Sequence, residues 1–378
     1  MIFSNSRQKN STGMWLRRNI AILLILSLAL LVRVWGIDFG LPYFFHFDES
    51  TTIYSAFYAA ANRLQPHFFL FPMLYPYLLL ALYTAYFLIG TVGGLWTDPF
   101  GFFVSYVGDP SFFLILGRLL TVSFGVISVW SVYVIGKKLY GRRVGHLAAF
   151  FLALTFLHVQ ESHYIKQDVL TGLLSLLGFY FNFKIFKKGK LKDYLISGLI
   201  IGLFASVKYN FFILVPTLIL AHILRGGLGI KSFLDKKLVY AFLISGLIFF
   251  ILNPYIILEP TRAIPDIISQ SKLTTIQWVD SGNLPVWLYN FTYHLRYGMG
   301  LPLLFFSLIG TVYLTFTRKN QNLLLVSAPI SFFLTLAFFG GTTFARYNVM
   351  ILPLLVLISN LFLFKIISWH KSWDYPII

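Results

Sequence analysis

The stretch FFHFDESTTIY, residues 44–54, directly follows the first long apolar run of the chain and carries two adjacent carboxylates, Asp48 and Glu49. An acidic pair at the mouth of a membrane protein is placed either to bind a cation or to accept a proton. A simpler alternative is that Asp48 caps a short helix starting near Ser50 and Thr51, because Asp is a preferred N-cap residue. The rest of the sequence bears on this choice.

The composition indicates the class of protein. The chain has 378 residues, of which 58% are hydrophobic and 11% charged, whereas soluble proteins contain roughly a quarter charged residues. We therefore expect an all-α, polytopic integral membrane protein. The absence of cysteine excludes disulfides and Cys-based metal sites. The net charge of +17 would suggest nucleic acid for a soluble protein, but here it reports on topology, and we expect no nucleic-acid partner.

About ten apolar runs are long enough to span a bilayer, since a crossing helix needs about 20 apolar residues. They are residues 19–37, 112–135, 144–160, 169–183, 194–207, 209–224, 238–253, 301–316, 322–339 and 348–364. A further run, residues 71–96, also has sufficient length. If it crossed, every later loop would change sides.

The distribution of basic residues places this further run. If 71–96 does not cross and the N-terminus is cytoplasmic, most of the 30 Lys and Arg residues fall in cytoplasmic loops, as the positive-inside rule requires. If it crossed, the loops GKKLYGRR (residues 136–143) and KIFKKGKLKD (residues 184–193) would lie on opposite sides. We therefore predict that 71–96 forms a hairpin on the outer side, and that both termini are cytoplasmic.

This topology predicts a single transmembrane domain over residues 1–378, located in the plasma membrane and without a soluble domain. Its outer loops are expected at about 38–111, 161–168 and 255–300. The first should contain juxtamembrane helices. The last mixes charged and aromatic residues with prolines, a composition that suits helices lying at the membrane interface. An interfacial structural role and a cover over an acceptor cleft are both compatible with it.

Charged residues from five separate segments are expected to converge at the outer rim. They are Asp48, Glu49, Arg118, Glu161, His163, Lys166, Asp168, Lys208 and Arg346. Charges at this depth are costly unless they are paired or used, so they are candidates for function. For each Lys and Arg the alternative is snorkelling toward lipid phosphates.

The chemistry of this set favours transfer from a lipid phosphate. Arg and Lys neutralise a phosphate and stabilise it as a leaving group. A carboxylate can remove the proton of an acceptor hydroxyl or amine as it attacks. Because a phosphate leaves without being protonated, one carboxylate base suffices, and neither a metal nor another cofactor is required.

The chain resembles the GT-C type lipid-dependent membrane glycosyltransferases, in particular glycosyltransferase family 39, which includes the protein O-mannosyltransferases, and the related aminoarabinose transferases. The matching stretches cover nearly the whole chain and lie in the family's order. They are HFDES (46–50), HFFLFPMLYPYLLLAL (67–82), GRLLTVSFGVISVWSVYVIGKKLYGRR (117–143), HVQESHYIKQDVLTGLL (158–174), GLIIGLFASVKYN (198–210), ILNPYIIL (251–258) and ARYNVMILPLL (345–355).

The resemblance implies a sugar donor linked to polyprenyl phosphate, an acceptor that is a protein, lipid or glycan, and an active site on the extracytoplasmic face. It implies the following roles: Asp48 as catalytic base with Glu49 beside it, Asp168 as the second acidic site residue, Arg118, Lys208 and Arg346 at the carrier phosphate, and His163 and Lys166 at sugar or phosphate. The family's His-Pro-Pro segment is altered here to FPMLYP, residues 71–76, which displaces His67.

Three other functions remain as alternatives. Transfer of a whole lipid-linked oligosaccharide is weakened by the absence of the Asp-X-Asp motif expected there. A transporter or lipid flippase would place ionisable residues at the membrane midplane, whereas the charges here are expected at one rim. A non-catalytic scaffold would not need converging acids and bases.

Overall fold

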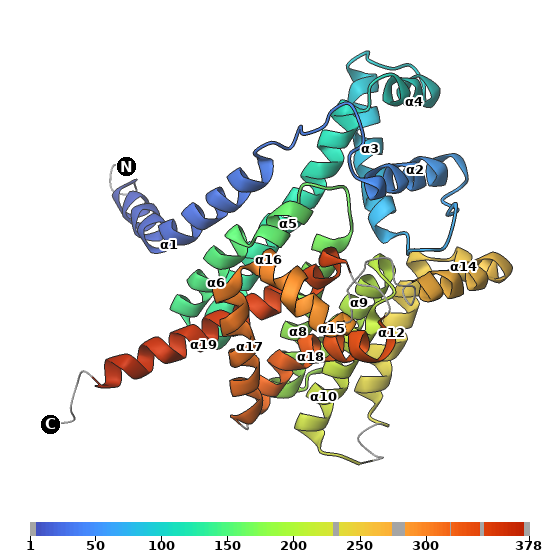
Figure 1. The fold of residues 1–378 in the computed structure, drawn as a ribbon. Helices are drawn as coiled ribbons and strands as arrows, with labels where there is room; N and C mark the ends of the chain where they lie inside the picture. The colour runs from blue at the N-terminus through green and yellow to red at the C-terminus, as the bar shows by residue number, and fades with distance from the viewer. Residues whose placement is uncertain (1–4, 230–233, 274–283, 318, 341–343, 374–378) are drawn as a thin grey trace.

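The computed structural model describes residues 5–229, 234–273, 284–317, 319–340 and 344–373. Within these ranges every regular element is a helix, which confirms the expected all-α class. Figure 1 shows a bundle of long helices, with α2, α3 and α4, which belong to the segment expected to form the first outer loop, projecting from one end of it. The first described helix begins, and the last described helix ends, at the left of this view.

The bundle consists of helices that match the apolar runs of the sequence. They are α1 (Asn5–Val34), α5 (Ser111–Tyr140), α6 (Arg142–Leu154), α8 (Asp168–Lys188), α9 (Leu191–Val207), α10 (Leu214–Gly226), α12 (Lys236–Leu252), α17 (Leu301–Phe316), α18 (Asn320–Phe339) and α19 (Leu352–Trp373). On length and composition, four described helices are able to cross a membrane: α3, α5, α8 and α18. The expected number of about ten crossings stays a prediction.

Small residues bring the bundle helices close together. Gly136 of α5 faces Gly145 of α6, and a Cβ on Gly136 would lie 3.0 Å from the Gly145 Cα. A Cβ on Gly202 of α9 would lie 2.7 Å from the Ser245 carbonyl oxygen of α12. Such close backbone contact is how helices associate within lipid, where apolar side chains gain little from leaving an equally apolar solvent.

The remaining helices connect the bundle at its polar end and elsewhere. They are α2 (Phe47–Ala61), α3 (Leu74–Val92), α4 (Pro99–Gly108), α7 (Phe156–Glu161), the 3₁₀ helix η1 (Phe211–Ile213), α13 (Tyr255–Leu258), α14 (Pro260–Leu273), α15 (Val286–Tyr289), the π-helix η2 (Asn290–Leu295), α16 (Arg296–Met299) and the 3₁₀ helix η3 (Ala345–Met350). Residues 274–283 of the expected 255–300 loop lie outside the described residues.

The position at which α2 starts excludes the alternative that Asp48 is an N-cap residue. The helix begins at Phe47, and its N-cap is His46, whose Nδ1 accepts a hydrogen bond from the backbone N–H of Asp48 at 3.1 Å. Asp48 is therefore inside the first turn and does not cap a helix near Ser50. Its side chain remains available for other contacts, while its position in the first turn is favourable for an anion.

Helix α3 runs beside only the first part of α5. The Tyr75 hydroxyl lies 2.5 Å from the Thr121 hydroxyl, and the Tyr83 hydroxyl donates to the Phe113 carbonyl at 2.9 Å. Since α5 continues to Tyr140, α3 starts part-way along α5 and extends toward its N-terminal end. This geometry supports the prediction of a hairpin on one side of the bundle, although α3 has the length to cross.

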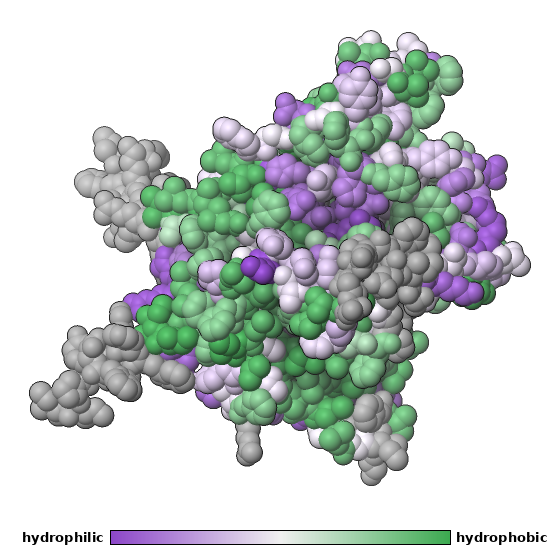
Figure 2. Space-filling view, in the orientation of Figure 1, coloured by the Kyte–Doolittle hydropathy of each residue, from purple (hydrophilic) through white to green (hydrophobic). Residues whose placement is uncertain are grey.

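The segment that begins at Tyr255 packs on the first outer loop. The Tyr255 hydroxyl donates to the Arg63 carbonyl at 2.8 Å, and the Asp266 carboxylate of α14 accepts from the backbone N–H of Phe69 at 2.9 Å. Two loops far apart in sequence therefore form one surface at the polar end. Figure 2 shows a hydrophilic area below the projecting hairpin, with hydrophobic surface on other parts of the bundle.

Candidate active site

Ionic contacts join four separate segments at one end of the bundle. The Arg346 guanidinium of η3 lies 3.3 Å from Asp48 Oδ2 of α2, and the Lys166 ammonium lies 3.5 Å from the same oxygen. The Lys208 ammonium, at the end of α9, lies 2.7 Å from Asp168 Oδ1 at the start of α8. The convergence expected from the sequence is therefore present for these five residues.

Lys166 occupies the centre of this cluster. Besides Asp48, its ammonium lies 3.1 Å from Glu161 Oε2 and 3.9 Å from Asp168 Oδ2. It also lies 3.2 Å from Nε2 of His46. A single ammonium thus balances carboxylates from three elements, a task that a divalent cation performs in other sites.

Aromatic rings accompany the two cations at the far side of the cluster. The Lys208 ammonium lies 4.4 Å from the centroid of the Tyr347 ring, and the Arg346 guanidinium lies 4.6 Å from that of Phe344. Cation–π contacts of this kind help to fix cations in place. Tyr347 was not among the candidate residues, although its position directly after Arg346 in ARYN would have pointed to it.

Glu49 and Arg118 form a separate, fully buried pair. Arg118 Nε and Nη2 donate to the two Glu49 carboxylate oxygens at 2.9 and 3.0 Å, and both side chains are 0% exposed. Arg118 Nη1 donates to the carbonyls of Ile37 and Phe39 at 2.7 and 2.9 Å. The backbone N–H of Ile165 donates to Glu49 Oε1 at 3.2 Å.

Every guanidinium nitrogen of Arg118 therefore donates a hydrogen bond within the protein. Arg118 ties α5 to the end of α1 and to α2, while Glu49 also holds the loop that carries Lys166. Both side chains are therefore engaged within the protein. The roles expected for Arg118 at a phosphate and for Glu49 in catalysis stay predictions.

His163 likewise faces the protein backbone. Its Nδ1 lies 2.9 Å from the Val159 carbonyl oxygen and its Nε2 lies 3.1 Å from that of Trp35. Both ring nitrogens are thus engaged, and the ring ties the loop after α7 to the end of α1. Of the two roles open to His163, this geometry favours orienting the loop over binding sugar or phosphate.

The exposed fractions of the side chains divide the ionic cluster into two groups. The side chains of Asp48, Arg346 and Lys208 are 31%, 26% and 16% exposed, whereas those of Lys166 and Asp168 are 2% and 3% exposed. Asp48, Arg346 and Lys208 are therefore the partly exposed members of the cluster. Lys166 and Asp168 are the buried members that pair with them.

The pKa values of two groups in the connecting segments, His46 and Glu161, are shifted by their surroundings. Burial, together with the positive charge of Lys166, lowers the pKa of His46, so its ring is neutral near pH 7 and can accept a hydrogen bond. Burial raises the pKa of Glu161, and the neighbouring Lys166 offsets only part of that rise. His46 was not among the candidate residues, although it lies in the stretch HFDES that the resemblance had singled out. Glu161 was among the converging charges but had been given no role.

The fold matches solved membrane enzymes over almost all of this chain. ArnT from Cupriavidus metallidurans, solved with bound undecaprenyl phosphate, superposes with a TM-score of 0.65 at 14% identity, covering 93% of this chain and 62% of that one. The apo oligosaccharyltransferase of Archaeoglobus fulgidus gives a TM-score of 0.61 at 14% identity, covering 95% and 52%. The chain has the GT-C fold. The expected GT-C fold is thereby confirmed.

A family profile agrees with the GT-C fold over part of the sequence. The family described as dolichyl-phosphate-mannose-protein mannosyltransferase matches residues 102–256. No curated protein sequence matches the chain. The chain spans about three fifths of the length of ArnT and about half that of the oligosaccharyltransferase. Structures that are 14% identical to the chain show its fold but not its activity. The activity is therefore inferred from the residues of the site.

Proposed function

We propose that this protein is an integral membrane glycosyltransferase that moves a sugar from a polyprenyl-phosphate donor to an acceptor on the extracytoplasmic side. The observation that carries the proposal is the pairing of the exposed Asp48 carboxylate with Arg346 at 3.3 Å, beside Lys208, at one end of a GT-C bundle. The family match and the undecaprenyl phosphate in the ArnT structure support the donor class.

The geometry suggests how the two substrates share the site. An incoming donor phosphate competes with Asp48 for Arg346 and with Asp168 for Lys208, because a phosphate forms strong charge-assisted hydrogen bonds with both cations. Once Arg346 has turned to the phosphate, an Asp48 oxygen is free to accept a hydrogen bond from the acceptor. Donor binding thus prepares the base.

The reaction is a single displacement with inversion. The acceptor oxygen or nitrogen forms a bond to the anomeric carbon of the sugar while its proton passes to Asp48. The bond between that carbon and the phosphate oxygen breaks, and its electron pair leaves with the phosphate. Arg346 and Lys208 stabilise the resulting charge on the polyprenyl phosphate.

Sidedness follows from the distribution of basic residues. The site lies at the ends of helices opposite the loops that contain Lys137, Lys187 and Lys236, and these basic loops are expected in the cytoplasm. We place the site, with the loops 38–111, 161–168 and 255–300, on the extracytoplasmic face. Helix α14, fixed to the first outer loop by Asp266, would then cover the acceptor side of the site.

Transfer from a labelled donor tests the proposal. Purified protein in vesicles should consume a polyprenyl-phosphate-linked sugar and release polyprenyl phosphate when membrane extract supplies acceptors. An Asp48→Asn variant serves as the control, since it keeps the fold but cannot take up the proton. A wild-type protein that consumed none of the monosaccharide donors but did consume a lipid-linked oligosaccharide would favour the oligosaccharide alternative.

A further inference from the structure

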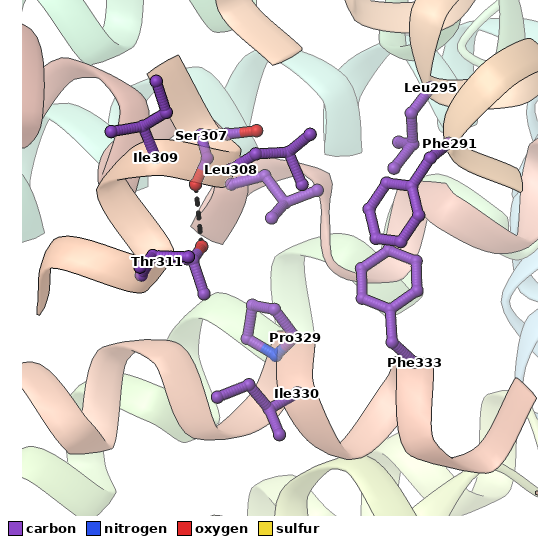
Figure 3. Close-up of a pocket in the computed structure, with 11 residues that line it drawn as sticks. Phe291, Leu295, Ser307, Leu308, Ile309, Thr311, Pro329, Ile330 and Phe333 are labelled. Carbon is purple, nitrogen blue, oxygen red and sulfur yellow. Dashed lines mark hydrogen bonds between the residues drawn. The ribbon is translucent and has the colours of Figure 1, made fainter. Parts of the chain in front are cut away.

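The groove drawn in Figure 3 lies between α17 and α18 and has a volume of about 330 Å³. Its lining is apolar except for two hydroxyl groups, and both are bonded within α17. Thr311 donates to the Ser307 carbonyl at 2.7 Å, and Ser307 donates to the Leu304 carbonyl at 2.8 Å. The groove therefore adds no polar chemistry to the proposed reaction. A polar group that this reaction leaves without a role, the imidazole ring of His46, lies instead beside Asp48.

The His46 ring joins the start of α2 to the central cation of the cluster. Its Nδ1 accepts a hydrogen bond from the backbone N–H of Asp48 at 3.1 Å and lies 4.0 Å from Oδ2 of the same residue. Its Nε2 lies 3.2 Å from Lys166 Nζ. The Tyr164 ring packs against the imidazole with centroids 4.6 Å apart. The ring is thus held between the proposed base and the ammonium that contacts this base.

Capping of α2 does not by itself account for a histidine at position 46. Asn, Asp, Ser, Thr and Gly are the preferred N-cap residues, and an asparagine would accept the same backbone hydrogen bond through its side-chain oxygen. Such a short side chain has no atom at the position of Nε2. The contact with Lys166 therefore distinguishes the imidazole from an ordinary cap.

The two contacts of His46 require the ring proton at different nitrogens. A neutral imidazole has one N–H donor and one acceptor nitrogen, whereas an ammonium only donates. When Nδ1 accepts from the backbone of Asp48, Nε2 carries the proton and cannot accept from Lys166. When Nε2 accepts from Lys166, Nδ1 carries the proton and directs a donor toward Asp48 Oδ2. A ring protonated at both nitrogens loses both acceptor contacts and places a second cation beside Lys166.

We propose that His46 is a positioning residue for Asp48 and that it acts as a neutral imidazole. This inference rests on the proposed function. With the proton on Nε2, the ring holds the first turn of α2 and with it the backbone of Asp48. With the proton on Nδ1, the ring donates to Asp48 Oδ2 after Arg346 has turned to the donor phosphate, which leaves Oδ1 for the acceptor. A base that is itself oriented by a further group recurs in catalytic sites.

The charged groups that face the ring come from three segments. Asp48 and Glu49 of α2 oppose Lys166 of the loop after α7 and Arg346 of η3 in their effect on the ring. Burial, the largest cause, lowers the pKa of His46, and Lys166 lowers it further. The unfolded chain therefore takes up the proton at a higher pH than the folded protein does. Stability should consequently fall as the pH drops below the ordinary pKa of a histidine.

Three substitutions separate the two contacts. His46→Asn keeps the cap, His46→Gln places an amide near Lys166 without capping α2, and His46→Ala removes both contacts. Initial rates of transfer from a polyprenyl-phosphate sugar, scaled to the folded fraction, give kcat and the donor KM. We expect His46→Ala to lower kcat by roughly 10²-fold, the effect of a misplaced catalytic group. The donor KM should hardly change, because Arg346 and Lys208 remain. His46→Asn and His46→Gln should each recover part of kcat, and a wild-type kcat in His46→Ala would overturn the proposal.

The pH dependence tests the requirement for a neutral ring. Between about pH 8 and 5, kcat and the unfolding temperature of the wild type should both fall, and both declines should be smaller in His46→Asn, which cannot take up the proton. His146→Asn is the matched control, since it removes a histidine of α6 whose ring contacts Tyr133 of α5, and its profiles should follow the wild type. Declines in His46→Asn as steep as those of the wild type would overturn the requirement.

Failure of this inference differs from failure of the proposed function. A wild-type protein that consumes no polyprenyl-phosphate sugar removes the function, and the positioning role with it. An active wild-type protein beside an equally active His46→Ala variant leaves the function in place, and only the role of His46 is then wrong.

Discussion

Substitution at each member of the acidic pair should separate chemistry from folding. Asp48→Asn keeps the shape of a residue whose side chain is 31% exposed; of its two cations, Arg346 is partly exposed and the buried Lys166 keeps Glu161 and Asp168 as partners. Loss of such an ion pair costs about 0 to 1 kcal/mol of stability. Loss of a general base lowers turnover by roughly 10² to 10⁴-fold, which corresponds to about 3 to 5 kcal/mol of activation free energy. The fold should survive while sugar transfer is nearly lost.

Glu49→Gln should behave in the opposite way. Glu49 is fully buried and receives two hydrogen bonds from Arg118 and one from Ile165. Gln removes the only carboxylate that the structure shows bound to Arg118 and leaves a buried, uncompensated cation, which costs about 3 to 5 kcal/mol. We expect a large fall in the thermal unfolding temperature, with activity lost in proportion to unfolded protein.

The assay for this contrast uses both variants in detergent and in vesicles. Thermal unfolding gives the stability, and initial rates with a saturating polyprenyl-phosphate sugar, scaled to the folded fraction, give the turnover. The reasoning is refuted if Asp48→Asn transfers sugar at the wild-type rate. It is also refuted if Glu49→Gln is as stable as the wild type, because the buried pair would then contribute nothing to the stability of the fold.

Three further predictions concern the carrier, the pH dependence and the topology. Arg346→Gln should weaken donor binding by about 1.5 to 3 kcal/mol, the value of a charge-assisted hydrogen bond. Arg346→Lys should keep part of that binding free energy, and equal KM values for both variants and the wild type would contradict this prediction. Because burial raises the pKa of Glu161 in the folded state, the native protein keeps a proton that the unfolded chain releases, and stability should fall as the pH rises above the ordinary pKa of a glutamate. Glu161→Gln should flatten the plot of unfolding temperature against pH, and an unchanged slope would assign that dependence to other groups. In this cysteine-free chain, a cysteine at Thr97 should react with an impermeant reagent from outside and one at Lys138 only after permeabilisation, while external labelling at Lys138 would mean that residues 71–96 cross.

The sequence was sufficient to predict the helical class and the convergence that brings Asp48 to Arg346 and Asp168 to Lys208. Apolar periodicity marks helix ends, and Lys208 and Arg346 adjoin such ends on one expected side. The same pattern could not show which cation each acid binds. That choice depends on the direction of each side chain within the first turn of α2, where neighbouring residues point about 100° apart.

Glu49 and Lys166 illustrate what the sequence left open. Asp48 and Glu49 are neighbouring acidic residues in the sequence. In the structure the Asp48 side chain is partly exposed, whereas the Glu49 side chain is buried and paired with Arg118. Lys166 appeared as one cation in the loop ESHYIKQD, whereas the fold places its ammonium among carboxylates from three elements. Three-dimensional packing of loops, which has no periodic signal, sets both outcomes.

The arrangement of charges gives a reason for the division between exposed and buried ionic groups. Within the described cluster, Lys166 stays fixed between Glu161 and Asp168, so it holds the carboxylates together whether or not a donor is present. Arg346 is partly exposed and contacts Asp48 at 3.3 Å, so a phosphate can draw it away. Asp48 would therefore lose its contact with Arg346 only when a donor occupies that cation, while the contact with Lys166 at 3.5 Å remains. The buried pairs provide a rigid frame, and the exposed pair between Asp48 and Arg346 is the contact that the substrates are able to exchange.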